Sequence, residues 1–191
     1  GEVQDEPAVA VHDQPGVGLP QLGLVHARNA TAGGPCGGIL AGVVAIASAG
    51  AGFLLAVLWF DLMFDVQALG HRERELPEDV LASIAGYYRR VTTTAHPMSR
   101  LIAAVMLATL GALIAQVAGD DTPTWVASAS LALAAAAILL AGSRTVPGAT
   151  RLGARTGTIE QQSVLARSIL REHLFCLAAI AALLVLQLAA A

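Results

Sequence analysis

Hydrophobic and polar positions along this chain are arranged in long blocks, not at the short periods of soluble helices and strands. Four charge-free apolar runs stand out, at about residues 39–60, 101–118, 125–142 and 174–190. A helix rises about 1.5 Å per residue, so runs of this length are typical of segments that cross a hydrocarbon core of roughly 30 Å. The pattern predicts an all-α fold, a four-helix transmembrane bundle within a membrane domain of residues 36–191.

The segment in front of the first run has a different composition. Residues 1–35 are rich in Gly, Pro, Ala and acidic residues, and they contain no long apolar run. Such a segment cannot bury enough surface to offset the entropy of ordering it, so a disordered N-terminal tail is predicted. It also lacks the basic start and apolar stretch of a signal peptide.

The connection between the first two runs contains a different kind of helix. Pro77 suits a first helical turn, and Glu78 and Asp79 suit the positive end of the helix dipole. Over residues 77–96 one face is apolar: Val80, Leu81, Ile84, Tyr87, Tyr88 and Val91. This predicts an amphipathic helix that lies on the membrane surface or caps the bundle and ends before Pro97.

The remaining connections are simpler. Residues 119–124 form a tight turn, which makes the second and third spans antiparallel neighbours. Residues 143–157 contain Pro, Gly and Arg and are predicted to be a loop. From Thr158, a reasonable N-cap, a helical pattern continues to the C-terminus.

Composition and charge support a membrane protein and suggest how it sits. The chain is 55% hydrophobic and 13% charged, against about 25% charged in soluble domains. A net charge of −3 leaves no basic surplus for a nucleic-acid partner. Five arginines lie in each long connection, one lies in the tail and none in the short turn. The positive-inside rule then predicts a multi-pass cell-membrane protein with cytoplasmic long connections and both termini on the outer side.

Two carboxylates at the end of the first run are candidates for chemistry. Asp61 and Asp65 are four residues apart and share one helix face. Such a pair can bind a divalent metal, relay a proton, act as an acid and base, or simply be solvated at the interface. Arg100 opens the second span, where it either anchors the helix at the interface or pairs with one of these carboxylates.

Polar residues inside the last helix are also costly in lipid. His173 falls on the apolar stripe that contains Leu165, Ile169 and Cys176, so it faces the bundle as a ligand, a base or a satisfied core histidine. Gln187 lies 16 residues past Arg171, and Gln116 lies 16 past Arg100, so the amides reach similar depth. They form an interhelical hydrogen bond or line a polar path.

The layout resembles small four-span bacterial membrane proteins of the anthrone-oxygenase-like family. The segments that carry the resemblance are 144–147 and 167–173, which leads into the final helix, and it extends over about residues 39–191. It implies a cofactor-independent oxygenation of an aromatic substrate. No nucleotide, metalloprotease or haem-attachment motif is present, so neither a cofactor nor a metal is assigned.

Three functions fit these observations. The first is a small membrane enzyme whose catalytic residues are Asp61, Asp65, Arg100 and His173, at the cytoplasmic boundary. The second is an accessory subunit that packs against a larger membrane complex. The third is a transporter or channel with a polar path between Arg100 and the two glutamines. The expected partners are the lipid bilayer and either another membrane protein or a second copy of the chain.

Overall fold

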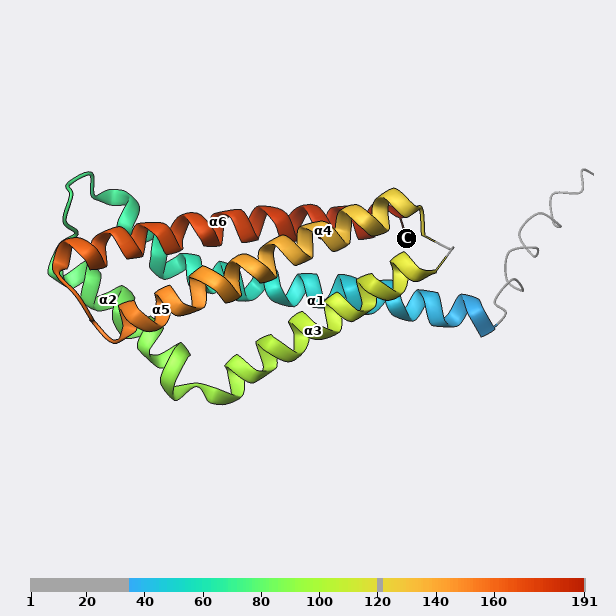
Figure 1. Ribbon diagram of the computed structural model, residues 1–191, viewed down its shortest axis with the longest axis horizontal. Coiled ribbons are helices and arrows are strands. Elements are labelled where there is room, and N and C mark those ends of the chain that lie inside the picture. Colours follow the sequence, from blue (N-terminus) through green and yellow to red (C-terminus); the bar gives the residue numbers. More distant parts are fainter. Residues whose placement is uncertain (1–34, 120–121, 191) are drawn as a thin grey trace, which may run out of the picture. The chain divides into compact units, whose positions relative to one another are not determined.

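The computed structural model describes residues 35–119 and 122–190, which form helices and no strand. Four long helices run alternately in opposite directions (Figure 1). They are α1 (Pro35–Asp65), α3 (His96–Ala118), α4 (Thr124–Leu140) and α6 (Ile159–Ala190). The predicted all-α bundle of four transmembrane helices is confirmed. Residues 1–34 of the predicted disordered tail lie outside the described residues.

Four continuous helical stretches are long and apolar enough to cross a membrane: Ala41–Gly70, Pro97–Ala118, Thr124–Gly153 and Ile159–Ala190. Large apolar side chains point outward from them, with Leu107, Leu139 and Val185 all more than 60% exposed. In water this surface would be costly, whereas lipid solvates it. The chain is therefore a polytopic integral membrane protein, and the finer span limits of the sequence analysis stay predictions.

Small side chains set the packing inside the bundle. α1 packs against α3 and α6, and α4 packs against the same two helices. The shared core is rich in alanine, with Ala47, Ala51 and Ala134 almost completely buried. α1 and α3 come close together at Gly50, where a Cβ atom would overlap the Oγ1 atom of Thr109. Without a hydrophobic force between helices in lipid, such close contact is what holds them together.

An amide cluster joins three helices near the end of the bundle away from α2. Gln116 Nε2 donates to Gln187 Oε1 over 2.8 Å, and Gln187 Nε2 donates back to Gln116 Oε1 over 3.0 Å. Gln187 Nε2 also lies 3.1 Å from Ser130 Oγ, which brings in α4. The predicted hydrogen bond between the two glutamines is confirmed.

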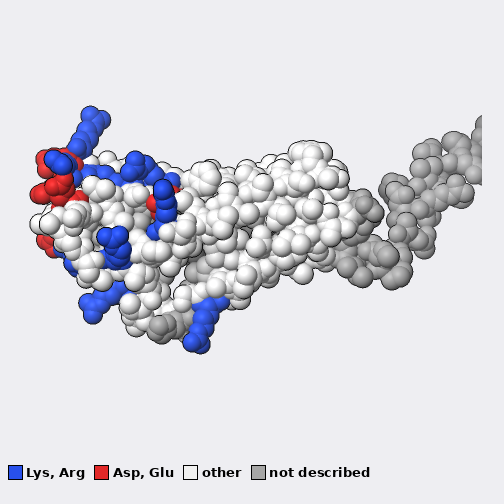
Figure 2. Space-filling model, viewed as in Figure 1, with Lys and Arg blue, Asp and Glu red and all other residues white. Residues whose placement is uncertain are grey.

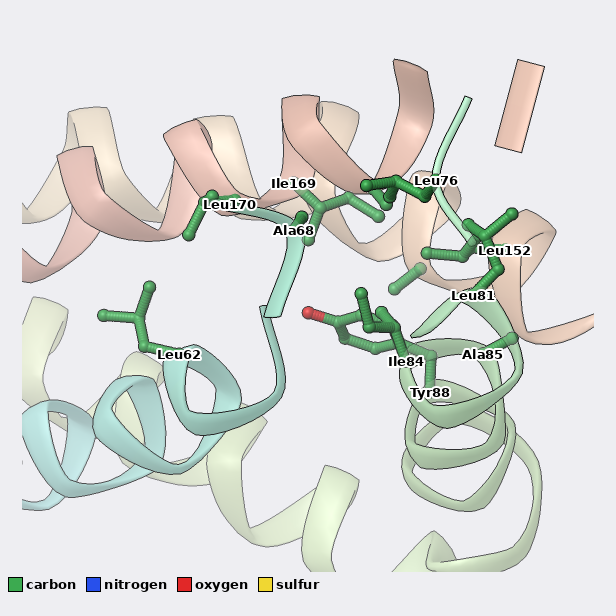
Figure 3. Close-up of a cluster of buried hydrophobic side chains, with 12 residues drawn as sticks. Leu62, Ala68, Leu76, Leu81, Ile84, Ala85, Tyr88, Leu152, Ile169 and Leu170 are labelled. Atoms are coloured by element: carbon green, nitrogen blue, oxygen red, sulfur yellow. The ribbon is translucent and has the colours of Figure 1, made fainter. Parts of the chain in front are cut away.

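The other end of the bundle is extended by shorter helices. A 3₁₀ turn (Val66–Gly70) continues α1, and α2 (Glu78–Arg89) ends in a π-helical turn, Arg90–Thr94. α2 packs against α5 and α6, so of the two predicted arrangements it takes the capping one. One apolar cluster joins this end of the molecule (Figure 3). It contains side chains of α1, α5 and α6 together with Leu81, Ile84 and Tyr88 of α2.

Residues 143–157 are mostly helical, which differs from the predicted loop. α4 continues through a π-helical turn, Ala141–Thr145, into α5 (Val146–Gly153). Pro147 follows the π-helical turn, and because it has no N–H it donates no hydrogen bond back to that turn. The predicted cap of the last helix is confirmed: Thr158 Oγ1 accepts from Gln161 N over 3.3 Å, and Gln161 Oε1 accepts from Thr158 N over 3.2 Å.

Charged side chains gather at the end that carries α2 and α5, while the long body is uncharged on the face shown in Figure 2. In the part of the chain that the structure describes, every charged residue lies within positions 61–100 or 144–172. This division gives an apolar region for the bilayer core and a polar end for its interface.

Candidate functional site

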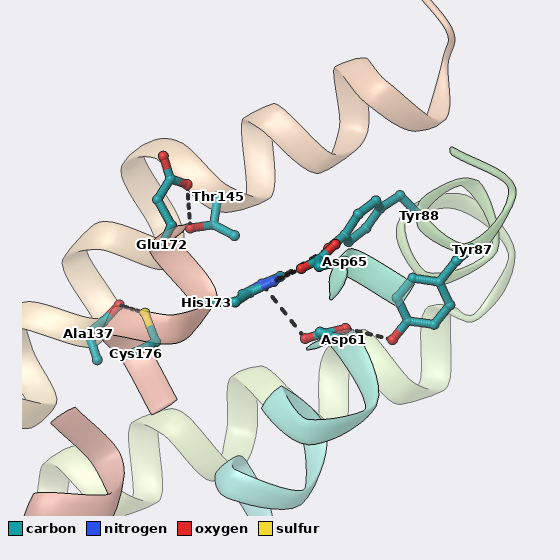
Figure 4. Close-up of polar contacts among 9 residues, drawn as sticks. All are labelled: Asp61, Asp65, Tyr87, Tyr88, Ala137, Thr145, Glu172, His173 and Cys176. Carbon is teal, nitrogen blue, oxygen red and sulfur yellow. Dashed lines mark hydrogen bonds and ion pairs between the residues drawn. The ribbon is translucent and has the colours of Figure 1, made fainter. Parts of the chain in front are cut away.

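Three helices bring five polar side chains together where the apolar body meets the polar end (Figure 4). They are Asp61 and Asp65 of α1, Tyr87 and Tyr88 of α2, and His173 of α6. Asp61 and Asp65 reach the same place because residues four apart lie on one helix face. His173 joins them because it is on the inward apolar stripe of α6, with 6% of its surface exposed. We call these five residues the polar cluster.

Asp65 is the buried centre of the polar cluster. Its exposed fraction is 0%, and both carboxylate oxygens are occupied. Oδ1 accepts from the Tyr88 hydroxyl over 2.6 Å, and Oδ2 lies 2.6 Å from His173 Nδ1. An ionised carboxylate only accepts, so with Asp65 in that form the proton of this second bond is on His173 Nδ1. Asp65 therefore fixes the orientation of the imidazole ring.

Asp61 is less completely paired. Its Oδ1 accepts from the Tyr87 hydroxyl over 2.5 Å. Its Oδ2 lies 3.8 Å from His173 Nε2, which is within reach of an ion pair but too far for a hydrogen bond. The side chain is also 14% exposed. Asp61 thus keeps acceptor capacity that Asp65 has already used.

The two tyrosines stay protonated and act as donors. Burial raises the pKa of Tyr87 and of Tyr88 well above the ordinary value of 10.0, and the neighbouring carboxylates raise them further. The ring of Tyr87 is also stacked on Phe64, with centroids 4.1 Å apart. The phenols therefore hold α2 against α1 through hydrogen bonds that persist at neutral and mildly alkaline pH.

A groove of about 410 Å³ lies beside the polar cluster. Asp61, Tyr88 and His173 line it, whereas Asp65 and Tyr87 do not. Most of its surface is apolar and comes from all four long helices, including Leu54, Leu58, Ile102, Met106, Ile138 and Ile180. The groove is a mainly apolar space with one polar wall.

Three of the four predicted catalytic residues meet in this site. Asp61, Asp65 and His173 converge, as an enzyme site would require, but a binding site would require the same. Arg100 is exposed at the start of α3, and within the described residues it forms no ion pair with either aspartate. A catalytic role for any of the four stays a prediction.

Tyr87 and Tyr88 were not predicted as functional residues, because the helical pattern places them only on an apolar face. One signal was available: a buried tyrosine needs a hydrogen-bond partner for its hydroxyl. Two adjacent tyrosines on an inward face therefore call for two acceptors. The identity of those acceptors depends on how α2 docks, which periodicity within one helix does not give.

Two further hypotheses can be compared with the geometry. Within residues 35–119 and 122–190, no group of three or more His, Cys, Asp or Glu side chains is placed to hold a metal ion. The polar path of the transporter hypothesis would include Gln116 and Gln187, but neither lines the groove. Their amides are instead bonded to each other.

A model of the SHR3 chaperone family, described as ER membrane protein SH3, matches residues 40–190. The match extends over all four membrane helices and the polar end. The chain belongs to this family. No curated protein and no solved structure matches the chain. The family is described as one of ER membrane proteins, and this chain is a multi-pass membrane protein.

The SHR3 assignment corrects the predicted localisation. The cell membrane, with the outer side as the location of both termini, is wrong because the family is one of ER membrane proteins. Bacteria have no ER, so a bacterial origin is not supported either. Hydropathy and arginine counts respond to any bilayer and do not distinguish one organelle from another. The resemblance to the anthrone-oxygenase-like family stays a prediction.

Proposed function

We propose that this SHR3-family chain is an accessory chaperone of the ER membrane that holds transmembrane segments of client membrane proteins. The observation that carries the proposal is the groove, which lies among the membrane-crossing helices and is lined mostly by apolar side chains. The name of the family, SHR3 chaperone, supports the same function. Both favour the accessory-subunit hypothesis over an enzyme or a transporter.

The lining of the groove suits a helix better than a small polar substrate. Away from the polar cluster its walls offer few hydrogen-bonding groups, so a polar molecule would lose its hydration without compensation. Helices in lipid associate through close packing and a few polar contacts. The groove combines both: apolar side chains such as Leu58 and Met106, and the polar wall that includes Asp61.

Site-specific photocross-linking tests this function. A small diazirine-bearing side chain is placed at position 106, inside the groove, or at position 107 as the matched control. Met106 lines the groove, whereas Leu107 is 70% exposed on the outer side of the same helix. The chain is then expressed in ER microsomes while a defined multi-span membrane protein is synthesised into them.

The new membrane protein should be cross-linked from position 106 several times more strongly than from position 107. Position 107 should instead form adducts mainly with lipid, because it faces the bilayer. Equal yields of protein adduct from both positions, or only lipid adducts from position 106, would rule out the groove as a client-binding site.

A further inference from the structure

The polar cluster beside the groove contains fewer positive charges than negative ones. When ionised, Asp61 and Asp65 carry two negative charges, and His173 offers at most one positive charge to balance them. No arginine is among the residues that line the groove, as far as the structure describes the chain. An unbalanced carboxylate at the edge of a bilayer is costly unless it takes up a proton or a cation. This part of the groove therefore favours a positively charged occupant.

The geometry identifies which atoms are available to that occupant. Asp65 uses both oxygens within the cluster, and it does not line the groove. Asp61 lines the groove, and its Oδ2 has no hydrogen-bond donor from His173 at 3.8 Å. In a neutral imidazole protonated at Nδ1, the Nε2 atom of His173 is also an acceptor. Asp61 Oδ2 and His173 Nε2 then form two adjacent acceptors.

A neighbouring carboxylate adds negative charge but is held by other side chains. Glu172 precedes His173 on α6, and its oxygens accept from Thr145 over 2.9 Å and from Ser168 over 3.1 Å. It is therefore already engaged, and it adds to the negative potential near the groove. The available acceptor from a carboxylate is the one on Asp61.

The apolar lining of the groove indicates which kind of molecule carries the positive charge. From Asp61 the α1 wall continues to Leu54, and from His173 the α6 wall continues to Ile180. Seven residues of helix correspond to about 10 Å, or two turns. A free amine or a metal ion would leave this wall uncovered, whereas a transmembrane helix covers it. The occupant is thus a helix with a basic side chain at the level of Asp61 and about two apolar turns beside it.

Resting on the function proposed above, we propose that Asp61 and His173 bind a Lys or Arg side chain in the transmembrane segment of a client protein. The ammonium or guanidinium group donates to Asp61 Oδ2 and supplies the positive charge that the polar cluster lacks. The groove thereby selects client segments whose basic residue would otherwise lie unpaired near the membrane boundary.

The test uses three otherwise identical membrane-protein probes. Each carries Lys, Leu or Glu at one position near the end of its transmembrane segment, and cross-linking is started from position 106 as above. The Lys probe should be captured about tenfold more than the Leu probe, the effect of one charge-assisted hydrogen bond. The Glu probe should be captured least because it adds a further negative charge.

An isosteric variant then assigns the selectivity to one residue. Asp61→Asn keeps an oxygen that accepts from Tyr87, so the fold should be retained, but it removes the negative charge. It should bring capture of the Lys probe down to that of the Leu probe measured on the same variant. If the variant does not accumulate, the three probes on the wild-type chain still decide the proposal.

The outcomes separate the two proposals. Equal capture of the Lys and Leu probes by the wild-type chain, with position 106 still above position 107, overturns the basic-residue proposal and leaves the chaperone function standing. If no probe is captured from position 106 above the level from position 107, both proposals fail. Adducts from position 106 that contain only lipid also overturn both.

Discussion

The two neighbouring tyrosines of α2 donate hydrogen bonds to different carboxylates. Tyr88 is buried and donates to the fully buried Asp65, so its bond belongs to the packing of the bundle. Tyr87 is half-buried and donates to Asp61, which lines the groove. Successive residues of a helix point in directions about 100° apart, which is how one element can support both carboxylates.

This arrangement predicts an unusual alkaline titration. The chain has only two tyrosines, and both belong to the polar cluster, so phenolate absorbance reports on that cluster alone. Because the pKa of each phenol is raised, absorbance should not rise near pH 10 in the folded protein, whereas the unfolded chain should titrate there. The free energy of unfolding should decrease as the pH rises above about 10, since only the unfolded state then loses these protons.

Asp65→Asn provides the control, because it removes the charge that adds to the effect of burial on Tyr88. Both phenols should then titrate at a lower pH than in the wild type, and Tyr88 should change more because it also donates to Asp65. A wild-type protein whose two phenols titrate at their ordinary pKa while it remains folded would contradict the cluster.

For single residues, the sequence predicts which side chains point into the bundle but not which residues they bond to. Asp61, Asp65 and His173 could be recognised because periodicity within a helix shows which residues share a face. Arg100 could not be excluded in the same way, because its separation from the aspartates depends on the direction in which α3 leaves the bundle. The tyrosine hydroxyls depend equally on the docking of α2.

Among the elements, the contact between α1 and α3 gives the sharpest prediction. Gly50→Ala should lower the free energy of unfolding by about 1–3 kcal/mol, because its Cβ would overlap Thr109 Oγ1 and force the two helices apart. Gly52→Ala, two residues further along α1, meets nothing within 4 Å and should be nearly neutral. Thermal unfolding in detergent measures both.

Thr109→Ala in the Gly50→Ala chain should restore part of the lost stability, because it removes the overlapping oxygen. A Gly50→Ala chain as stable as Gly52→Ala would show that the helices do not meet there. Ser48 and Gly52 have the four-residue spacing of small residues that is typical of helix contacts in membranes. Spacing alone does not give the rotation of a helix, so it could not identify Gly50 as the point of contact.

The helical structure of residues 143–157, at the polar end, was the part of the fold that the sequence predicted least well. Pro147, Gly148 and Gly153 indicated a loop, since all three residue types commonly interrupt helices. In the structure a Cβ on Gly153 would lie 2.7 Å from the backbone nitrogen of Arg89, and Gly148 packs near Leu165 and Ile169. These glycines permit close packing of α5 against α2 and α6, which is a tertiary requirement that local propensity does not contain.

For the whole molecule, membership of the SHR3 family predicts where the chain is found. An epitope-tagged chain should fractionate with ER membranes and remain in the pellet after extraction with alkaline carbonate, because four helices cross the bilayer. The charge-free run 174–190 spans about 26 Å, which suits the thin ER hydrocarbon core of roughly 27 Å. Release by carbonate, or enrichment in the plasma membrane, would contradict this assignment.

The amide cluster at Gln116 affects how wide the groove can be. α3 is attached there to α4 and α6, and at Thr109 it touches α1, whereas its groove-lining residues all belong to its first half. α3 is thus held by hydrogen bonds near its C-terminal end, while its N-terminal half borders the groove. A tilt of about 10° around Gln116 would move Leu101 by about 4 Å, since the two are roughly 22 Å apart along the helix. The groove would then admit transmembrane segments of different diameter, while the end of α3 at Gln116 keeps its hydrogen bonds.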